Sequence, residues 1–231
     1  MDKKSPFQQV FISMPINLIK EEGLNLWQTG YHTQHRSRNA QGWHSLTLYG
    51  EGPYITLGGD YGDSSKYHWT DIGKRMCPAT VEWLQSLPYK ELYRARFMFL
   101  EPGGYIKIHH DKEPEEAIGE VVVDDAMNIS VTQPNNCYLR QVFKDGYSDV
   151  PFKEGSAFFF NNRYFHYAEN RSSEIRIHLI LHAKWHFLSL RKCKLKFIKQ
   201  NYLNHGNELY ENKERLNDVI ENYSPDLSSY Y

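Results

Sequence analysis

The sequence predicts a mainly β protein, folded as an antiparallel barrel or jelly roll. Six apolar or alternating segments follow one another between Glu91 and His182, and Gly, Pro, Asn and Asp divide them with no helical pattern between. Aromatic residues make up 15% of the chain and include 17 tyrosines, which favours sheets with large rings packed between them. The 231 residues suffice for one domain with an added segment.

The residues before this β region predict strands and one helix. Up to about Asp60 the pattern is a β-type opening with long loops, in which Gly42–Gly50 is the clearest strand. In "CPATVEWLQSLP", Pro78 suits a first helical turn, and apolar residues recur every three positions from Val81 to Leu87. This segment is therefore expected to be a helix that ends at the following proline.

The β region and the end of the chain differ in character. The expected strands are "LYRARFMFL", "YIKIHH", "AMNISVTQP", "NCYLRQVF", "GSAFFFNN" and "EIRIHLILHAKW". After Trp185, apolar residues at helical spacing among charges predict a helix in "NELYENKERLNDVIENY". We expect a jelly-roll domain over 1–185, with flanking helices, and a helical C-terminal extension over 186–231.

Charge and cysteine usage exclude several classes of protein. The net charge of −1 points to neither nucleic acid nor an anionic membrane surface, and the basic cluster Arg191–Lys199 reads as a solvated face. No apolar run approaches the roughly 20 residues that span a bilayer. The three cysteines, Cys77, Cys137 and Cys193, lie far apart and are expected to be free thiols. We therefore expect a cytoplasmic protein.

A candidate metal site lies in "GGYIKIHHDKE". On an extended strand His109 and Asp111 share one face, whereas His110 points to the other. His166, which follows the strand "AFFF", is the best third ligand. Two imidazoles and one carboxylate leave three positions of an octahedron open, which is the ligand set of non-haem Fe(II) oxygenases. Among 11 histidines, His-x-Asp on its own is equally compatible with a loop.

A buried arginine strengthens the oxygenase interpretation. Arg176 lies ten positions after His166, within the otherwise apolar strand "EIRIHLILH". A buried guanidinium is costly unless it meets an anion, and its planar fork suits a carboxylate. An iron site with such an arginine nearby suits a dicarboxylate cosubstrate that chelates the metal at one end and binds Arg176 at the other.

Together these motifs resemble the Fe(II)- and 2-oxoglutarate-dependent dioxygenases, and in particular their aspartyl/asparaginyl β-hydroxylase branch. The resemblance rests on the following segments in this order: "GWHSLTLYG", "CPATVEWLQSLP", "RARFMFLEPGGYIKIHHD" and "FNNRYFHYAENRSSEIRIHLIL". It implies a double-stranded β-helix (cupin-like jelly roll) in which His109, Asp111 and His166 hold iron and Arg176 binds the distal carboxylate of 2-oxoglutarate. The implied reaction uses O2 and releases succinate and CO2.

One departure from the branch bears on the reaction type. Some members have glycine in place of the carboxylate ligand, and a related halogenating chemistry needs that position empty. This sequence has Asp111, which favours hydroxylation.

Alternation adds two candidate cosubstrate residues. In "AMNISVTQP", Asn128 shares a face with Ser130 and Thr132, opposite three apolar side chains. The branch has a polar residue, typically histidine, that assists 2-oxoglutarate at the position of Asn128. His178 shares a face with Arg176 by the same parity, and is a candidate contact of either the cosubstrate or the substrate. Each could equally be a satisfied polar residue within a barrel.

Other features of the sequence remain open to two interpretations. Arg94 and Arg96 alternate with apolar residues, so they either recognise an anionic substrate or form structural ion pairs. The acidic loop Lys112–Ala126 is either a lid over the ligands or a solvated excursion. The aromatic side chains of Trp43 and of Phe158 to Phe160 are interpreted as core.

The expected function is hydroxylation of an unactivated C–H bond of an amino acid or a small amino-acid-derived metabolite. The alternative enzyme is a peptidyl Asp/Asn β-hydroxylase, although the short chain has no evident peptide-docking repeat. A rival of another class is a metal-binding jelly roll without oxygenase activity, such as a sensor or an isomerase. Arg176 discriminates against that rival, which has no use for a guanidinium at this position.

Overall fold

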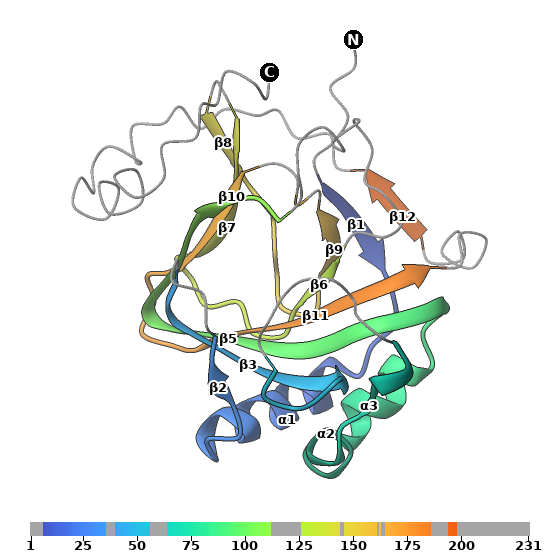
Figure 1. Ribbon diagram of the computed structural model, residues 1–231. Helices are drawn as coiled ribbons and strands as arrows, with labels where there is room; N and C mark the ends of the chain where they lie inside the picture. The colour runs from blue at the N-terminus through green and yellow to red at the C-terminus, as the bar shows by residue number, and fades with distance from the viewer. Residues whose placement is uncertain are drawn as a thin grey trace.

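The described part of the protein is largely a single curled sheet with the helices α1, α2 and α3 against its outer face (Figure 1). A computed structural model describes residues 7–35, 40–55, 64–111, 126–143, 146–160, 162, 165–185 and 194–197. Within these ranges, none of the helices has the length and apolar character needed to cross a membrane.

Among the described residues, the helices all lie in the first part of the chain, whereas strands occur throughout. The helices are α1 (Ile16–Gln28), α2 (Asp71–Met76) and α3 (Pro78–Gln85), with a 3-10 turn at Ser64–Lys66. The strands are β1 (Phe7–Phe11), β2 (Thr33–Gln34), β3 (Ala40–Gly50), β4 (His68–Trp69), β5 (Tyr89–His109), β6 (Met127–Ser130), β7 (Cys137–Phe143), β8 (Gly146–Asp149), β9 (Ala157–Phe160), β10 (His166–Asn170), β11 (Arg176–Trp185) and β12 (Lys194–Phe197).

The strands are ordered β12-β1-β9-β6-β11-β5-β10-β7-β8, and each pairs antiparallel with its neighbours. In Figure 1, β7 and β10 lie opposite β6 and β9, while β5, β11 and β3 run beneath them. This curled antiparallel arrangement is the jelly roll that the sequence predicts, and the mainly β fold class is confirmed.

The long strand β5 connects the two walls of the roll. Its first part pairs with β3 and β11, and its last residues pair with β10. The change of wall follows the Pro-Gly-Gly sequence, where Gly103 has a φ of 74° that favours glycine. A Cβ at Gly104 would lie 2.8 Å from the Glu101 carbonyl oxygen and 3.0 Å from that of Gln41. The two segments predicted as separate strands are thus one strand, bent where only glycine fits.

Alternation along β5, β6 and β11 separates core from interior. Odd-numbered side chains pack on the helical side in the main core, namely Ala95, Phe97, Phe99, Met127, Ile129, Ile177, Leu179 and Leu181. Even-numbered side chains line the interior, namely Arg94, Arg96, Met98, Leu100, Asn128, Arg176, His178, Ile180 and His182. The face predicted for Asn128 is therefore the interior one.

The helices are fixed closely to this core. Gly23 of α1 lies against the sheet, because an added Cβ would be 3.2 Å from Phe97 Cε1 and 3.4 Å from Ile177 Cγ2. Glu22 Oε1 and Oε2 accept from the backbone N–H groups of Ala79 and Thr80 at 2.8 and 2.9 Å. This carboxylate satisfies free N–H groups and opposes the positive end of α3.

The structure differs from the sequence interpretation at both ends. Helix α1 lies in a region predicted as strands and loops; its buried residues, Ile19, Gly23 and Leu26, have helical spacing, but the middle one is glycine. The cap, Pro15, makes no side-chain hydrogen bond, so no capping signal marked the start. Beyond residue 185, β12 pairs with β1, so the sheet takes a strand from the expected helical extension.

Several expectations lie outside the described residues. They include the helix in "NELYENKERLNDVIENY", the lid at 112–125, and Cys193. Cys77 and Cys137 are free and buried, as predicted. The domain boundary at residue 185 stays a prediction.

We expect Gly104→Ala to lower the free energy of unfolding by about 1–3 kcal/mol, because the new methyl group meets two backbone carbonyls that cannot rotate away. Thermal and urea unfolding measure the change. Gly52→Ala is the matched control, since its Cβ would meet only the Ile55 side chain, at 3.4 Å. Equal stability of the two variants would contradict the constraint at the bend.

Candidate metal centre and its cavity

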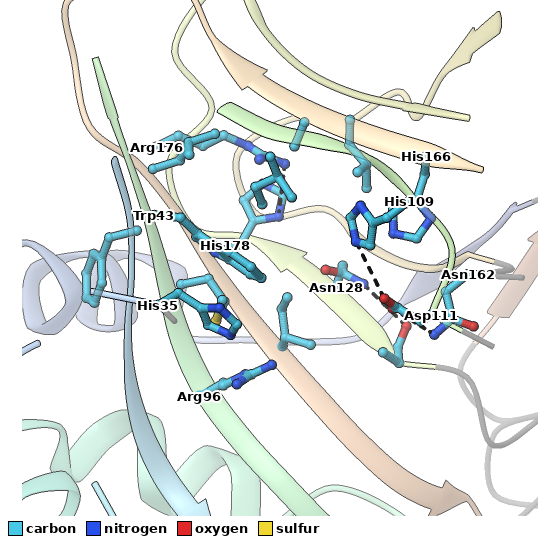
Figure 2. A pocket seen from close by; sticks show the side chains of 18 of the residues that line it. His35, Trp43, Arg96, His109, Asp111, Asn128, Asn162, His166, Arg176 and His178 are labelled. Atoms are coloured by element: carbon cyan, nitrogen blue, oxygen red, sulfur yellow. Dashed lines mark hydrogen bonds and ion pairs between the residues drawn. The ribbon is translucent and has the colours of Figure 1, made fainter. Parts of the chain in front are cut away.

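A cavity of about 570 Å³ lies inside the roll and collects the polar side chains of the interior face. Figure 2 shows the histidine and aspartate group at one end, Arg176 and His178 at another, and Arg96 with His35 along a third side. All eight site residues proposed from the sequence line it: Arg94, Arg96, His109, Asp111, Asn128, His166, Arg176 and His178. The volume is that of a small-molecule site.

His109, Asp111 and His166 come together at the metal end. His109 ends β5 and pairs across the ladder with His166, the first residue of β10. One ligand atom from each of the three residues lies within 4.8 Å of the others, and His109 Nε2 is 3.5 Å from Asp111 Oδ1. The group is the only one with three such ligands among the described residues. Two imidazoles and one carboxylate are a donor set compatible with iron.

Neighbouring groups orient these side chains. His109 Nδ1 donates to the Lys107 carbonyl at 2.7 Å, which leaves Nε2 facing Asp111. Asn162 Nδ2 donates to Asp111 Oδ2 at 3.1 Å, and the Asn162 carbonyl accepts from the Asp111 N–H at 3.0 Å. These contacts leave Asp111 Oδ1 and His109 Nε2 for a shared ion, as outer partners of metal ligands commonly do.

The charged and polar groups around Asp111 favour its ionised form. Desolvation alone would raise the pKa of Asp111, but His166, His109, the Asn162 N–H and Arg96 together hold it below its ordinary value. A carboxylate that is charged without metal is ready to bind a cation.

His110 does not belong to the ligand group. Its ring packs edge-on against Phe165 with centroids 5.1 Å apart, although it also contributes to the cavity wall. The metal group includes His109 and leaves His110 out, which is the register expected from strand parity.

Arg176 is a buried cation with little compensation. Its side chain is 5% exposed, and Nε has no hydrogen-bond partner. Among the described residues its one hydrogen bond goes to His178 Nδ1, at 3.3 Å. Burial lowers the pKa of Arg176 to about 10, so the guanidinium is still charged at neutral pH. An anion in the cavity would stabilise it.

His178 and Asn128 are buried beside the same space. Burial, and then the charge of Arg176, holds the pKa of His178 well below its ordinary value, so the ring is neutral. Asn128 Nδ2 has a long contact of 3.4 Å with the Ala126 carbonyl. Both polar side chains face the cavity.

A cationic and aromatic wall lies away from the metal ligands. Arg94 Nη2 donates to His182 Nε2 at 3.2 Å, and Arg96 is 6% exposed. The His35 ring stacks on Trp43 with centroids 3.6 Å apart. Burial, Arg96 and Arg94 lower the pKa of His35 to about 3, so this imidazole is neutral. Trp43 lines the cavity and also packs against the smaller core cluster, so the core interpretation of this ring is incomplete; Phe158 and Phe159 are core residues as predicted.

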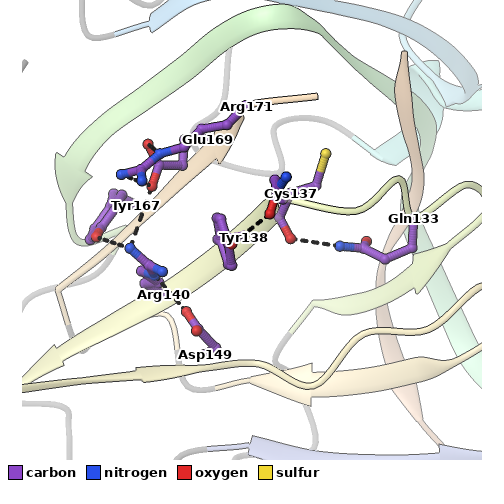
Figure 3. Close-up of polar contacts among 9 residues, drawn as sticks. Gln133, Cys137, Tyr138, Arg140, Asp149, Tyr167, Glu169 and Arg171 are labelled. Atoms are coloured by element: carbon purple, nitrogen blue, oxygen red, sulfur yellow. Dashed lines mark hydrogen bonds and ion pairs between the residues drawn. The ribbon is translucent and has the colours of Figure 1, made fainter. Parts of the chain in front are cut away.

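An ionic cluster fixes the strands that carry His166. Arg140 of β7 is buried and donates to Asp149 Oδ1 at 2.6 Å, to the Tyr167 hydroxyl at 3.2 Å and to Glu169 Oε1 at 3.4 Å (Figure 3). Its guanidinium also lies 4.1 Å from the centroid of the Tyr138 ring. The cluster joins β7, β8 and β10 on the face opposite the cavity, and so holds β10 in register.

Three residues of the site escaped sequence reasoning. Asn162 lies four residues before His166, with no motif to mark it, and only the fold brings it to Asp111. His35 lies in an irregular segment of the N-terminal region, and Gln133 lies after β6; neither has a spacing signal. The aromatic signal of Trp43 was visible, but it does not distinguish a core ring from a cavity ring.

The jelly roll and the cavity with its His-Asp-His group are those of an iron- and 2-oxoglutarate-dependent oxygenase. The family follows from the sequence, because the profile of the aspartyl/asparaginyl beta-hydroxylases matches residues 15–186. This match covers more than half of the chain, and the protein belongs to that family.

Solved structures resemble the chain at low sequence identity. A prolyl-4-hydroxylase from Pseudomonas putida is 15% identical with a TM-score of 0.43, over 78% of this chain and 93% of its own. A Trichoplax adhaerens prolyl hydroxylase, solved with a hypoxia inducible factor peptide, is 13% identical with a TM-score of 0.47, over 81% and 87%. The epimerase SnoN from nogalamycin biosynthesis is 10% identical with a TM-score of 0.47, over 78% and 77%. No protein of curated function matches the sequence.

We expect His109→Ala and His166→Ala each to abolish retention of Fe(II), because two remaining ligands hold the ion poorly. His110→Ala is the matched control and should keep it. Metal content after anaerobic dialysis measures the outcome. Loss of iron from the His110 variant, with retention in the His109 variant, would show that the strand register is wrong.

Proposed function

We propose that the protein hydroxylates an unactivated C–H bond of an amino acid or small amino-acid-derived metabolite, using Fe(II), 2-oxoglutarate and O2. The observation that carries the proposal is the presence, in one cavity, of a two-histidine, one-carboxylate group and a buried guanidinium without an anionic partner among the described residues. A metal-binding jelly roll with no oxygenase activity gives no reason for that guanidinium.

The residues fit iron and its cosubstrate in defined roles. His109, Asp111 and His166 would hold the ion, and Arg176 would bind the distal carboxylate of 2-oxoglutarate through two charge-assisted hydrogen bonds. Asn128, which faces the same space, would contact the cosubstrate. The chemistry supplied when these groups are bound is oxidative decarboxylation to succinate and CO2, coupled to substrate hydroxylation.

The protein's own contribution is orientation and exclusion of water. Asn162 holds Asp111 as an acceptor, and the Lys107 carbonyl fixes the tautomer of His109. Met98, Leu100 and Ile180 line the cavity between the polar groups. These apolar side chains keep the reacting region dry, which strengthens each electrostatic contact within it.

The wall formed by Arg94 and Arg96 is proposed to bind an anionic group of the substrate. The described lining holds three arginines and one acidic residue, and that residue, Asp111, is assigned to the metal. Arg94 and Arg96 line the same cavity as the metal group, so their positive charge would attract an anionic group of a substrate. The Trp43 and His35 rings offer a flat neutral surface beside them.

Release of succinate tests the reaction and the substrate class together. Purified protein with Fe(II), ascorbate and 2-oxoglutarate is screened against acidic, neutral and basic amino acids, their small derivatives, and peptides containing Asp or Asn. We expect stimulated succinate release with a small anionic compound, and a product heavier by one oxygen in mass spectrometry. Stimulation by peptides alone would support a peptidyl Asp/Asn hydroxylase, and no stimulation by either class would contradict hydroxylation of such substrates.

Arg176→Leu should weaken 2-oxoglutarate binding about 10- to 100-fold, because the distal carboxylate loses its charged partner. Fe(II) affinity should stay within about twofold, since Arg176 is no ligand in the proposal. Calorimetric titration of both ligands measures the change. Arg75→Leu, on the exposed surface of α2, is the control for loss of one positive charge. Unchanged 2-oxoglutarate affinity in the Arg176 variant would refute its role.

We also propose that the protein works in a reducing compartment such as the cytoplasm. The free, buried thiols of Cys77 and Cys137 support this.

A further inference from the structure

A chain of hydrogen bonds extends from Arg176 through His178 and Gln133 into the backbone of β7, and we call it the Arg176 relay. Arg176 Nη2 contacts His178 Nδ1 at 3.3 Å, and His178 Nε2 contacts Gln133 Oε1 at 3.4 Å. Gln133 Nε2 in turn donates to the Cys137 carbonyl at 2.8 Å, the bond drawn in Figure 3. Ser130 Oγ donates to Gln133 Oε1 at 3.1 Å. The chain thus connects β11 with the end of β6, the turn that follows it and the start of β7.

The donor at one end of this chain and the acceptor at the other determine the protonation state of the ring between them. A guanidinium can only donate, so His178 Nδ1 must accept. A backbone carbonyl can only accept, so the Gln133 amide directs its nitrogen to Cys137 and its oxygen to His178. His178 Nε2 must then carry the proton. Both ends require the same neutral tautomer, with hydrogen on Nε2 and none on Nδ1.

The ring and the amide are also held in place by their surroundings. His178 is 4% exposed, and its ring meets Phe152 edge-on with centroids 4.6 Å apart. The Val131 and Thr132 N–H groups donate to the Ile177 carbonyl at 2.9 and 3.0 Å. The Ile177 N–H donates to Thr132 Oγ1 at 2.8 Å. The segment that carries Gln133 is therefore fixed to the segment that carries Arg176 and His178.

We propose that Gln133 is a positioning residue, which holds His178 in the Nε2–H tautomer so that His178 Nδ1 aims the Arg176 guanidinium at the distal carboxylate of the cosubstrate. His178 then acts as a support for Arg176, in place of the direct cosubstrate contact expected from the sequence. This inference rests on the proposed role of Arg176 in binding 2-oxoglutarate.

The proposal explains why a histidine can lie beside a buried cation. In the other tautomer, or as an imidazolium, His178 would present an N–H to the Arg176 N–H and push the guanidinium away. The low pKa of His178, caused by burial and by Arg176, agrees with a ring that stays neutral. Burial keeps the His178 ring neutral but does not determine which of its nitrogens is protonated. The amide of Gln133 determines that choice.

The test compares two 2-oxo acids on protein loaded with Mn(II), which replaces iron and prevents turnover. Pyruvate can chelate the metal but lacks the distal carboxylate of 2-oxoglutarate. The dissociation constant of pyruvate divided by that of 2-oxoglutarate, both measured by calorimetry, therefore isolates the contact with Arg176. We call this quotient the ratio. We expect wild-type protein to bind 2-oxoglutarate about 10- to 100-fold more tightly than pyruvate, and Arg176→Leu to remove the difference.

Two substitutions at Gln133 address the relay itself. Gln133→Glu keeps the shape but places a carboxylate against His178, which favours protonation of the ring, so the ratio should fall about tenfold. Gln133→Met removes the acceptor without adding charge, and the ratio should fall about threefold to tenfold. In both variants pyruvate affinity should be unchanged. Gln85→Glu, on the exposed face of α3, makes the same chemical change away from the cavity and should leave the ratio at the wild-type value.

The possible outcomes distinguish failure of the proposed role of Arg176 from failure of the proposed role of Gln133. A ratio near one in wild-type protein would overturn the proposed role of Arg176, and the relay with it. A ratio that is high in wild type, lost in Arg176→Leu and unchanged in the Gln133 variants would overturn the relay alone. Equal weakening of both oxo acids would show that Gln133 only supports the fold.

A measurement on the wild-type protein keeps the test independent of any variant that fails to fold. Nitrogen-15 NMR of labelled histidine, with the His178 ring signals assigned by through-bond correlation to its own backbone, reports which ring nitrogen is protonated. We expect hydrogen on Nε2 and none on Nδ1 at neutral pH. The opposite tautomer, or a doubly protonated ring, would overturn the proposal.

Discussion

The backbone pairing of β5 determines where the polar side chains of this protein lie. Its first part is hydrogen-bonded between β3 and β11, and its end is bonded to β10, so one strand belongs to both walls of the roll. The register places Arg96 beside Ile180 and His109 beside His166. A slip by one residue would turn the arginines and the metal ligands away from the interior. Gly103 and Gly104 let the strand change walls, and the pairing of β5 with β3 shifts register across this bend, between Gln41 and Trp43.

Buried arginines lie on both faces of the roll, and their charges are compensated in different ways. Arg140 lies on the outer side, where Asp149, Glu169 and tyrosine rings compensate it. Among the described residues, Arg176 has one hydrogen-bond partner, a neutral imidazole, and burial lowers its pKa. The first arginine stabilises the sheet, whereas the second, in the proposed role, would contribute binding energy to an anion. A buried arginine is thus compensated by acidic groups on the outer face of the roll, whereas the buried Arg176 faces the cavity without such compensation among the described residues.

Strand periodicity made much of this site predictable. Parity alone placed His109 with Asp111, Asn128 on the interior face, and His178 beside Arg176, because side chains two apart in a strand must share a face. It could not reveal Asn162, His35 or Gln133, since these residues reach the site from turns and irregular segments whose course depends on tertiary contacts. Helix α1 was missed for a related reason: its central buried residue is Gly23, selected by close packing against Phe97 and Ile177. In a sequence, a glycine that allows close packing cannot be distinguished from a glycine that allows a turn.

The walls of the cavity come from separate strands, and this has an evolutionary consequence. The metal ligands and the Arg176 relay lie on β10, β11, the end of β5 and the turn after β6, whereas Trp43 and Arg94 lie on β3 and the start of β5. Mutations in the second group can accumulate without disturbing the first. A lineage built on this scaffold can therefore diverge in the molecules it accepts while its oxidative chemistry is inherited unchanged.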